Sequence, residues 1–415
     1  MDASLDRVTA SARRSTVGLS TGMLGTIVLI GAIAPLATDM YVPAFPHVAR
    51  DLAAGASSVQ LTLTTFFVGM ALGQLAGGPV SDQRGRRRPL LVSLLVLVAA
   101  SMVCGVAPNM AVMMAARAVQ GFTGGWAMVI ARSVVVDLTS GPQLVWAMNL
   151  LAGIGGIEPI VGPLIGATIL QLSNWRMTFV AVAAFAALMV IAVWFVLPET
   201  LPEQRRRRGG LSKLLHSARA VLGHPEYVGY LLLVGFSMGV IFAYVATSAF
   251  VLQSMNGLSP IVYSVIFATN AVGLTIGTLV SARLVGRVPT RTVIATGVAA
   301  TGAAGAFMFV GAWWWGMPLV VAIVGFFVLM TAQGLINANA GALASNAVPD
   351  HPGTGSALLG FLQWCMAGVI APLAGLGGDR TAVPMAAIVL ALTVGSLLAL
   401  IVARPQPHQS LPASR

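Results

Sequence analysis

Two acidic residues and one arginine lie inside long apolar segments of the sequence: Asp39, Glu158 and Arg117. An ionisable group within membrane hydrocarbon costs at least ~2.5 kcal/mol on insertion scales, so it usually faces a cavity or a partner. Two carboxylates and one arginine in a low-dielectric cavity form a system whose charge can be balanced by binding or losing one proton. The pattern therefore predicts a proton-coupling site, although a helix-packing hydrogen bond, or for Asp39 a position near the membrane surface, would also fit.

The depths of these three residues follow from the rise of a helix, about 1.5 Å per residue. Glu158 is predicted roughly 18 Å from one surface, close to the midplane, with Arg117 roughly 10 Å and Asp39 roughly 6 Å from the other surface. A movement that exchanges Arg117 between water and a carboxylate would change the proton affinity of that carboxylate. A cationic compound beside Glu158 or Asp39 would likewise favour proton release, so both acids are also predicted to contact substrate.

The segments that carry these residues are predicted membrane spans. Of the 415 residues, 57% are hydrophobic and 8% are charged, whereas soluble proteins carry about 25% charged residues. Twelve apolar runs of roughly 20 residues leave no room for a large soluble domain. The runs lack the alternation of a lipid-facing barrel and are therefore predicted helices. They cover residues 19–44, 58–79, 89–107, 110–132, 146–171, 176–197, 226–252, 260–282, 292–311, 316–340, 355–376 and 383–403.

The basic residues predict the orientation of the spans. A net charge of +11 would suggest nucleic-acid binding in a soluble chain, but 19 of the 23 basic residues fall on one side of the predicted spans. By the positive-inside rule that side is cytoplasmic and holds both termini. The first apolar run, from Leu19, lacks a convincing cleavage site, so it is predicted to be a retained span. The cytoplasmic set is Arg7, Arg13, Arg14, Arg84, Arg86, Arg87, Arg88, Arg132, residues 205–208, Lys213, Arg219, Arg283, Arg287, Arg291, Arg404 and Arg415.

A polar stretch at residues 198–225 divides the chain into an N-terminal half, residues 1–197, and a C-terminal half, residues 226–415. A faint repeat supports the division, since SDQRGRRRP at 81–89 resembles SARLVGRVP at 281–289. Two similar six-span halves are typical of secondary transporters, with substrate bound near the midplane between them. Besides the two acids, the predicted substrate contacts are Tyr41, Trp126, Gln253, Asn270 and Asn337, although an aromatic in a span, such as Trp126, often serves only packing.

Two glycine-containing segments are predicted to control conformation. Residues 78–88, GPVSDQRGRRR, place Gly78, Asp82, Gly85 and Arg86 in a short cytoplasmic loop. There the glycines allow close approach and Asp82 can make a charge-assisted contact. Pro159 and Pro163 follow Glu158 within one and a half helical turns and predict a kinked helix beside closely packed neighbours. A simple positive-inside anchor and generic helix packing are the alternatives for the two segments.

These motifs resemble the major facilitator superfamily along the whole chain. Residues 78–88 are similar to its signature loop, and RAVQG at 117–121 is similar to its second motif, which adds Gln120 and Gly121 to the predicted gating residues. GPLIG at 162–166 resembles the motif of its drug:proton antiporters and adds Gly162 and Gly166, with Ala167 where a second glycine is usual. DMYVPAFP at 39–46 resembles the bicyclomycin and chloramphenicol efflux subgroup. The resemblance implies two pseudo-symmetric six-helix bundles that export drugs against protons across a bacterial cytoplasmic membrane.

Other classes of function lack their expected motifs. The only lysine, Lys213, stands outside any phosphate loop, which argues against ATP hydrolysis. GFSMG at 235–239 fits a hydrolase elbow but lies in a helical span, and the charge rings of a channel are missing. Cys104 and Cys365 suggest packing and not a disulfide or a metal site. The chain is therefore predicted to be a monomeric, non-enzymatic transporter without a cofactor other than the proton. A proton-coupled exporter or symporter of a metabolite is the alternative.

Overall fold

The computed structural model describes residues 19–206, 218–348 and 352–403, and within these residues it contains helices and no strand. Twelve long helices are present in this part of the chain, together with the short helix α3 (Phe45–Asp51). The long helices are α2 (Thr21–Asp39), α4 (Ala56–Arg84), α5 (Arg87–Gly105), α6 (Met110–Leu138), α7 (Gly141–Leu172), α8 (Arg176–Val196), α10 (Pro225–Ala249), α11 (Pro260–Leu284), α12 (Thr290–Trp315), α13 (Leu319–Asn346), α14 (Pro352–Ala374) and α15 (Val383–Val402).

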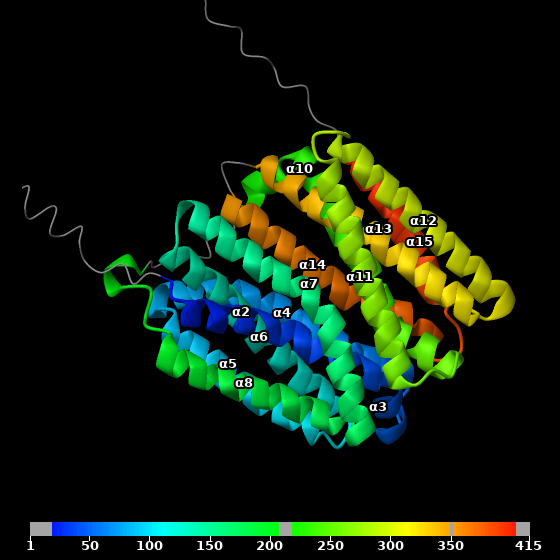
Figure 1. The fold of residues 1–415 in the computed structure, drawn as a ribbon, viewed down its shortest axis with the longest axis horizontal. Helices are drawn as coiled ribbons and strands as arrows, with labels where there is room; N and C mark the ends of the chain where they lie inside the picture. The colour runs from blue at the N-terminus through cyan, green and yellow to red at the C-terminus, as the bar shows by residue number, and fades with distance from the viewer. Residues whose placement is uncertain (1–18, 207–217, 349–351, 404–415) are drawn as a thin grey trace, which may run out of the picture.

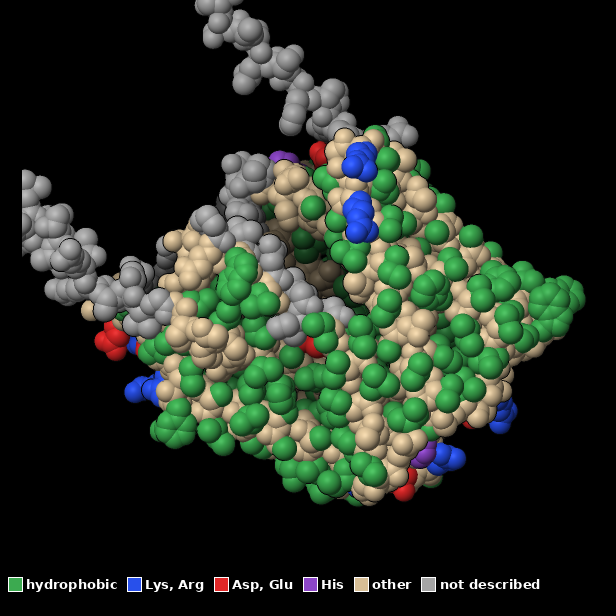
Figure 2. All heavy atoms as spheres, viewed as in Figure 1, with side chains coloured by type: hydrophobic (Ala, Val, Ile, Leu, Met, Phe, Trp, Pro, Cys, Tyr) green, Lys and Arg blue, Asp and Glu red, His purple; other side chains and the backbone are tan. Residues whose placement is uncertain are grey.

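These helices have the length and composition of membrane spans. Among the described residues, eleven are long and apolar enough to cross a membrane, and α7 contributes the apolar segment Ile157–Leu172. Figure 2 shows charged side chains at the two ends of the molecule and hydrophobic side chains over the surface between them. Trp313, Trp314 and Trp315 form the exposed last turn of α12, and exposed aromatic residues at helix ends are typical of the belt at a membrane surface. The chain is a multi-pass membrane protein, and the predicted all-helical fold is confirmed.

The helices form two groups that lie side by side (Figure 1). The first group, α2 to α8, and the second group, α10 to α15, each pack mainly within themselves. They meet along two seams, α4 against α14 and α7 against α11. The groups fall within the predicted halves, residues 1–197 and 226–415, while part of the predicted linker at 198–225 lies outside the described residues.

The two ends of the molecule differ in how tightly the groups meet. We call the end that carries the turn between α4 and α5 and residues 198–206 the linker end, and the opposite end, which carries α3, the α3 end. Figure 2 shows a hollow between the two groups at the linker end. All the hydrogen bonds that join the groups among the described residues lie toward the α3 end. The space between the groups therefore opens at the linker end and is closed at the α3 end.

The structure clarifies two segments whose boundaries bear on the predicted motifs. Residues 78–88 were expected to form a loop, but α4 continues through Gly78 and Asp82 to Arg84, so that only Gly85 and Arg86 separate α4 from α5. The helix stops at Gly85, whose φ of 87° is a left-handed conformation that glycine adopts without strain. The first span was expected to reach residue 44. The regular helix α2 ends at Asp39, but a turn of 3-10 helix, η1 (Val42–Ala44), continues into α3, so the candidate span runs to Asp51.

Candidate functional site

The two membrane carboxylates lie on neighbouring helices of the first group. Asp39 is the last residue of α2 and is 9% exposed, and Glu158 lies on α7 and is 6% exposed. Gly162, one turn after Glu158, packs against the Cβ of Asp39, so the two acids are about one helical turn, roughly 6 Å, apart in height. Neither carboxylate forms an ion pair or a hydrogen bond with another described residue.

The glycine motif of α7 holds α2 and α7 close together. A Cβ at Gly162 would meet the Asp39 side chain, and a Cβ at Gly166 would meet the backbone carbonyl of Met40. Pro159 and Pro163 lie within the same helix. The carbonyl of Pro163 accepts a hydrogen bond of 2.9 Å from the Ser264 hydroxyl of α11, in the other group. This stretch of α7 therefore contacts both Asp39 and the second group.

Arg117 lies apart from the two carboxylates in this conformation. Its guanidinium is 0% exposed, and it donates hydrogen bonds to the backbone carbonyl of Ala37 (3.1 Å) and to Gln120 (2.6 Å). Its Nε and Nη2 atoms have no hydrogen-bond partner among the described residues. The charge is shielded by three aromatic rings at 4.2 to 5.8 Å, those of Phe66, Tyr41 and Phe179. In this conformation the three predicted charges are thus two buried acids without a described ion pair and one arginine enclosed by aromatic rings.

Gln120 and Gly121 build the cage around Arg117. The Gln120 amide accepts from Arg117 and donates to Ser101 on α5 at 2.7 Å, which fixes the orientation of both polar groups. A Cβ at Gly121 would meet the backbone carbonyl of Phe66, so α4 and α6 are in direct backbone contact here. The motif therefore positions Arg117 by side-chain bonding and by helix packing together.

The second group repeats this arrangement without the charge. Gln333 and Gly334 form the same Gln-Gly pair on α13, and Gln333 donates to Thr301 on α12 at 2.9 Å. The Gln333 oxygen accepts from Ser237 of α10, where Gln120 accepts from Arg117. The Gln-Gly pair occurs once in each half of the sequence and could have revealed this pseudo-symmetric site. The repeat of residues 81–89 at 281–289 lies in other segments and did not point to it.

The predicted substrate contacts occupy several different places. Tyr41 is 1% exposed and is one of the three rings that enclose Arg117. Asn270 is 1% exposed and donates to Tyr244 at 3.0 Å. Trp126 packs beside Gly77, and its indole Nε1 has no described hydrogen-bond partner. Asn337 is partly exposed on α13. The predicted contacts therefore lie in both helix groups, Tyr41 and Trp126 in the first and Asn270 and Asn337 in the second.

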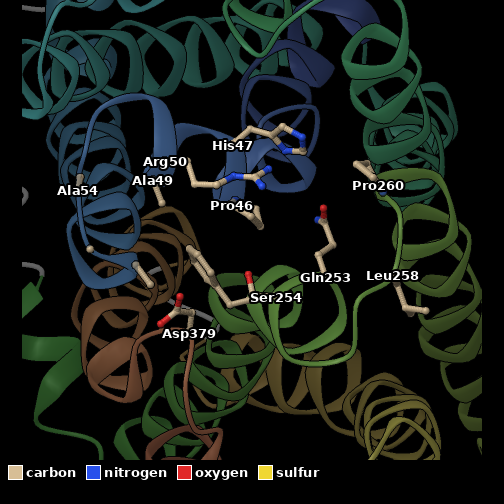
Figure 3. Close-up of a pocket in the computed structure, with 13 residues that line it drawn as sticks. Pro46, His47, Ala49, Arg50, Ala54, Gln253, Ser254, Leu258, Pro260 and Asp379 are labelled. Atoms are coloured by element: carbon tan, nitrogen blue, oxygen red, sulfur yellow. The ribbon is translucent and has the colours of Figure 1, made fainter.

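Gln253 belongs to a set of contacts that closes the α3 end. It lies in a π-helical segment, η3 (Phe250–Met255), and donates to the carbonyl of Pro43 at 3.0 Å. Beyond it is a cavity of about 600 Å³ that both groups line. Figure 3 shows His47 and Arg50 of α3 on one side of this cavity and Gln253 and Ser254 on the other. Gln253 therefore lies between that cavity and the interior.

Three further bonds complete this closure, which we call the α3-end gate. The Gln60 amide donates to the carbonyl of Ala246 at 2.9 Å, and Ser57 donates to that of Gly375 at 2.8 Å. The third is the bond from Ser264 to Pro163 described above, so that four bonds, with that of Gln253, form the gate. Each group supplies two donors, and every acceptor is a backbone carbonyl. Among the described residues, the gate is held by uncharged hydrogen bonds.

The linker end of the first group carries a charged network instead. Arg86 is 6% exposed and donates to Asp82 at 2.6 Å and to Asp137 of α6 at 2.9 Å. Glu199 accepts from the backbone N–H groups of Arg86 (2.7 Å) and Arg87 (3.2 Å) at the start of α5. Burial lowers the pKa of Arg86, but the hydrogen bond and charge of Asp137, with those of Asp82, outweigh it and leave this pKa above its usual value. The network joins α4, α5 and α6 to the segment after α8.

Comparison with known proteins assigns the family. Residues 27–372 match the model of the Major Facilitator Superfamily. The chain belongs to this superfamily. It is 35% identical over 378 residues to YdgK of Bacillus subtilis, an uncharacterised MFS-type transporter, covering 90% of this chain and 93% of the relative. A bicyclomycin resistance protein homolog of Haemophilus influenzae is 29% identical, with 90% and 94% covered. The predicted resemblance is thereby confirmed.

Solved structures agree with the superfamily fold. A D-xylose-proton symporter superposes with a TM-score of 0.72 at 15% identity, covering 92% of this chain and 97% of the symporter. At this identity the match supports the fold alone. As a member of the superfamily, the chain is a membrane transporter of small molecules and not an enzyme.

Several residues of this transporter escaped prediction because their partners are distant in sequence. Asp137 of α6 and Glu199, after α8, bind Arg86 and the start of α5, and neither was among the predicted site residues. Gln60 is a neutral residue whose partner is a backbone carbonyl 186 positions away, so no sequence pattern marked it. Gly78 was predicted to permit close approach, but a Cβ there would make only an ordinary 3.7 Å contact with Val129.

Proposed function

We propose that this chain exports lipophilic or cationic drugs across the bacterial cytoplasmic membrane in exchange for protons, by alternating access. Its family makes it a transporter, and the name of the H. influenzae relative links a similar sequence to bicyclomycin resistance. The observation that carries the proposal is the pair Asp39 and Glu158, two buried carboxylates without a described cationic partner.

Unpaired buried carboxylates suit drug–proton exchange for an electrostatic reason. Keeping a charge in a low-dielectric site without a counter-ion is costly, and either a proton or a bound cation removes that cost. Proton and cationic drug therefore compete for the same negative site. Because Arg117 is already caged by aromatic rings and Gln120, it does not neutralise these acids in this conformation.

The proposed orientation places the linker end in the cytoplasm, with both termini there. Arg84, Arg86, Arg87 and Arg88 gather at this end, as the positive-inside rule requires of a cytoplasmic surface. With this orientation, the closed α3-end gate and the hollow at the linker end correspond to a state open to the cytoplasm. The two helix groups would then rock as bundles within one monomer, opening and closing the two ends in turn.

The proposal can be tested by measuring the pH gradient of inverted membrane vesicles that are acid inside, before and after a drug is added. Addition of ethidium, a lipophilic cation, should dissipate the pH gradient only when this chain is present, because each ethidium ion taken up releases protons. Collapsing the gradient and the membrane potential with an uncoupler should stop ethidium uptake. Uptake that continues after that collapse would remove proton coupling from the proposal.

Gly85→Ala is expected to lower ethidium turnover about tenfold while changing ethidium affinity by less than about twofold. A residue with a Cβ strains the backbone at a φ of 87°. The added methyl group would also meet the Glu199 carboxylate, so the charged network must rearrange. Turnover in vesicles and calorimetric affinity measure the two quantities. Gly286→Ala is the matched control, because Gly286 has a φ of 77° but no neighbour within 4 Å. Equal losses in both variants would assign the effect to backbone strain alone.

A further inference from the structure

Three aromatic rings from both helix groups meet on the seam between α4 and α14. Phe67 of α4 lies 4.4 Å from Phe242 of α10 and 5.5 Å from Trp364 of α14, measured between ring centroids. Phe242 and Trp364 are 6.0 Å apart. The Phe67 and Trp364 rings are stacked with an interplanar angle of 28°. We call these residues the seam aromatic cluster.

The cluster lies near the middle of the membrane. Phe67 is eleven residues from the start of α4, about 16 Å along a helix of about 42 Å. Trp364 is twelve residues from the start of α14, about 18 Å along a helix of about 33 Å. Transporters built from two helix repeats bind substrate at this depth, between the repeats. The cluster thus has the position of a substrate contact.

The exposure of the three rings is uneven. Phe67 is 1% exposed and supports the other two rings from the first group. Phe242 and Trp364 are only partly buried, so each retains ring surface that no described residue covers. If the rings served only to pack the seam, burying this surface as fully as that of Phe67 would stabilise the folded protein further. Part of each of these two residues is therefore available to an apolar ligand that enters the seam.

We propose that Phe242 and Trp364, backed by Phe67, stack on a planar aromatic part of the transported compound. The inference rests on the proposed function and narrows its substrate class to planar aromatic cations. Aromatic faces attract cations as well as aromatic rings, and Asp39 and Glu158 supply negative charge within the same molecule. Because the rings come from both groups, a stacked substrate would contact the seam along which those groups move.

The test is calorimetric binding to the purified full-length protein, without any gradient. Ethidium is the planar aromatic probe and tetrapropylammonium is an aliphatic cation of equal charge. Trp364→Leu keeps an apolar side chain but removes the ring face, and should weaken ethidium binding about tenfold, equivalent to about 1.4 kcal/mol. Tetrapropylammonium affinity should change by less than about twofold. Phe242→Leu should act in the same direction and provides a second variant if the first does not fold.

Trp313→Leu is the matched control, because Trp313 is 63% exposed in the last turn of α12 and stacks on Phe309 away from the seam. It should leave both affinities unchanged. The proposal is overturned if wild-type protein binds ethidium no more tightly than tetrapropylammonium, or if Trp364→Leu and Phe242→Leu bind both probes as the wild type does. Because binding is measured without a proton gradient, this result is independent of whether transport proves to be proton-coupled.

Discussion

Glu158→Gln is expected to abolish the exchange of ethidium for protons, with a loss of at least about tenfold in ethidium-driven proton release, while the protein remains folded. Glutamine preserves the shape of the side chain and removes the group that binds the proton. Since Glu158 is 6% exposed and has no described ion-pair partner, its neutral form needs no compensating rearrangement. Vesicle acidification assays measure the exchange, and ethidium binding should weaken in parallel because a negative charge is lost.

Two companion variants separate coupling from structure. Asp39→Asn should also impair exchange, because Asp39 packs against Gly162, one turn from Glu158. Glu226→Gln should have no effect, since Glu226 lies in the first turn of α10, at the linker end and outside the proposed site. Exchange at wild-type stoichiometry in a well-expressed Glu158→Gln protein would move the proton site elsewhere, with Asp39 the next candidate.

Gly121→Ala is expected to destabilise the folded protein by about 3 kcal/mol, near the upper end of the range for overpacking. The added methyl group would meet the carbonyl of Phe66, which is backbone and cannot turn aside as a side chain can. The helices α4 and α6 would have to separate, which would also disturb the Arg117 cage between them. Thermal unfolding of the detergent-solubilised protein, followed by size-exclusion chromatography, measures the loss.

Gly78→Ala makes the same chemical change on α4 and provides the control. Its methyl group would lie 3.7 Å from Val129, an ordinary contact, so the unfolding temperature should change little. If Gly121→Ala unfolds at the same temperature as Gly78→Ala, direct backbone contact at Phe66 is not what holds these helices together.

The sequence predicted the helices well because apolar runs of span length are a strong signal, whereas the site required knowledge of helix rotation. Depth estimates placed Asp39, Glu158 and Arg117 in one bundle, and Gly162 does bring Asp39 near Glu158. Height along a helix does not specify which way a side chain points, and Arg117 faces Phe66 and Gln120 instead of either acid.

The polar helix ends show a second limit of prediction. Residues 78–84 are polar enough to resemble a loop, yet they continue α4 because backbone hydrogen bonding does not stop at the membrane surface. The resulting position of Asp82 and Arg86 opposite Asp137 depends on two helices, α4 and α6, extending equally far. No local pattern in the sequence of α4 or of α6 predicts that the two helices extend equally far.

The α3-end gate also bears on where such a transporter can operate. Its four bonds run from neutral side chains to backbone carbonyls, and no described ion pair joins the two groups there. Dissolved salt screens exposed charges over about 10 Å at 0.1 M but leaves buried neutral hydrogen bonds almost unaffected. If this end faces the surroundings of the cell, the four bonds of its closure depend little on external salinity, whereas the charged network built on Arg86 faces a cytoplasm whose ionic composition the cell itself regulates.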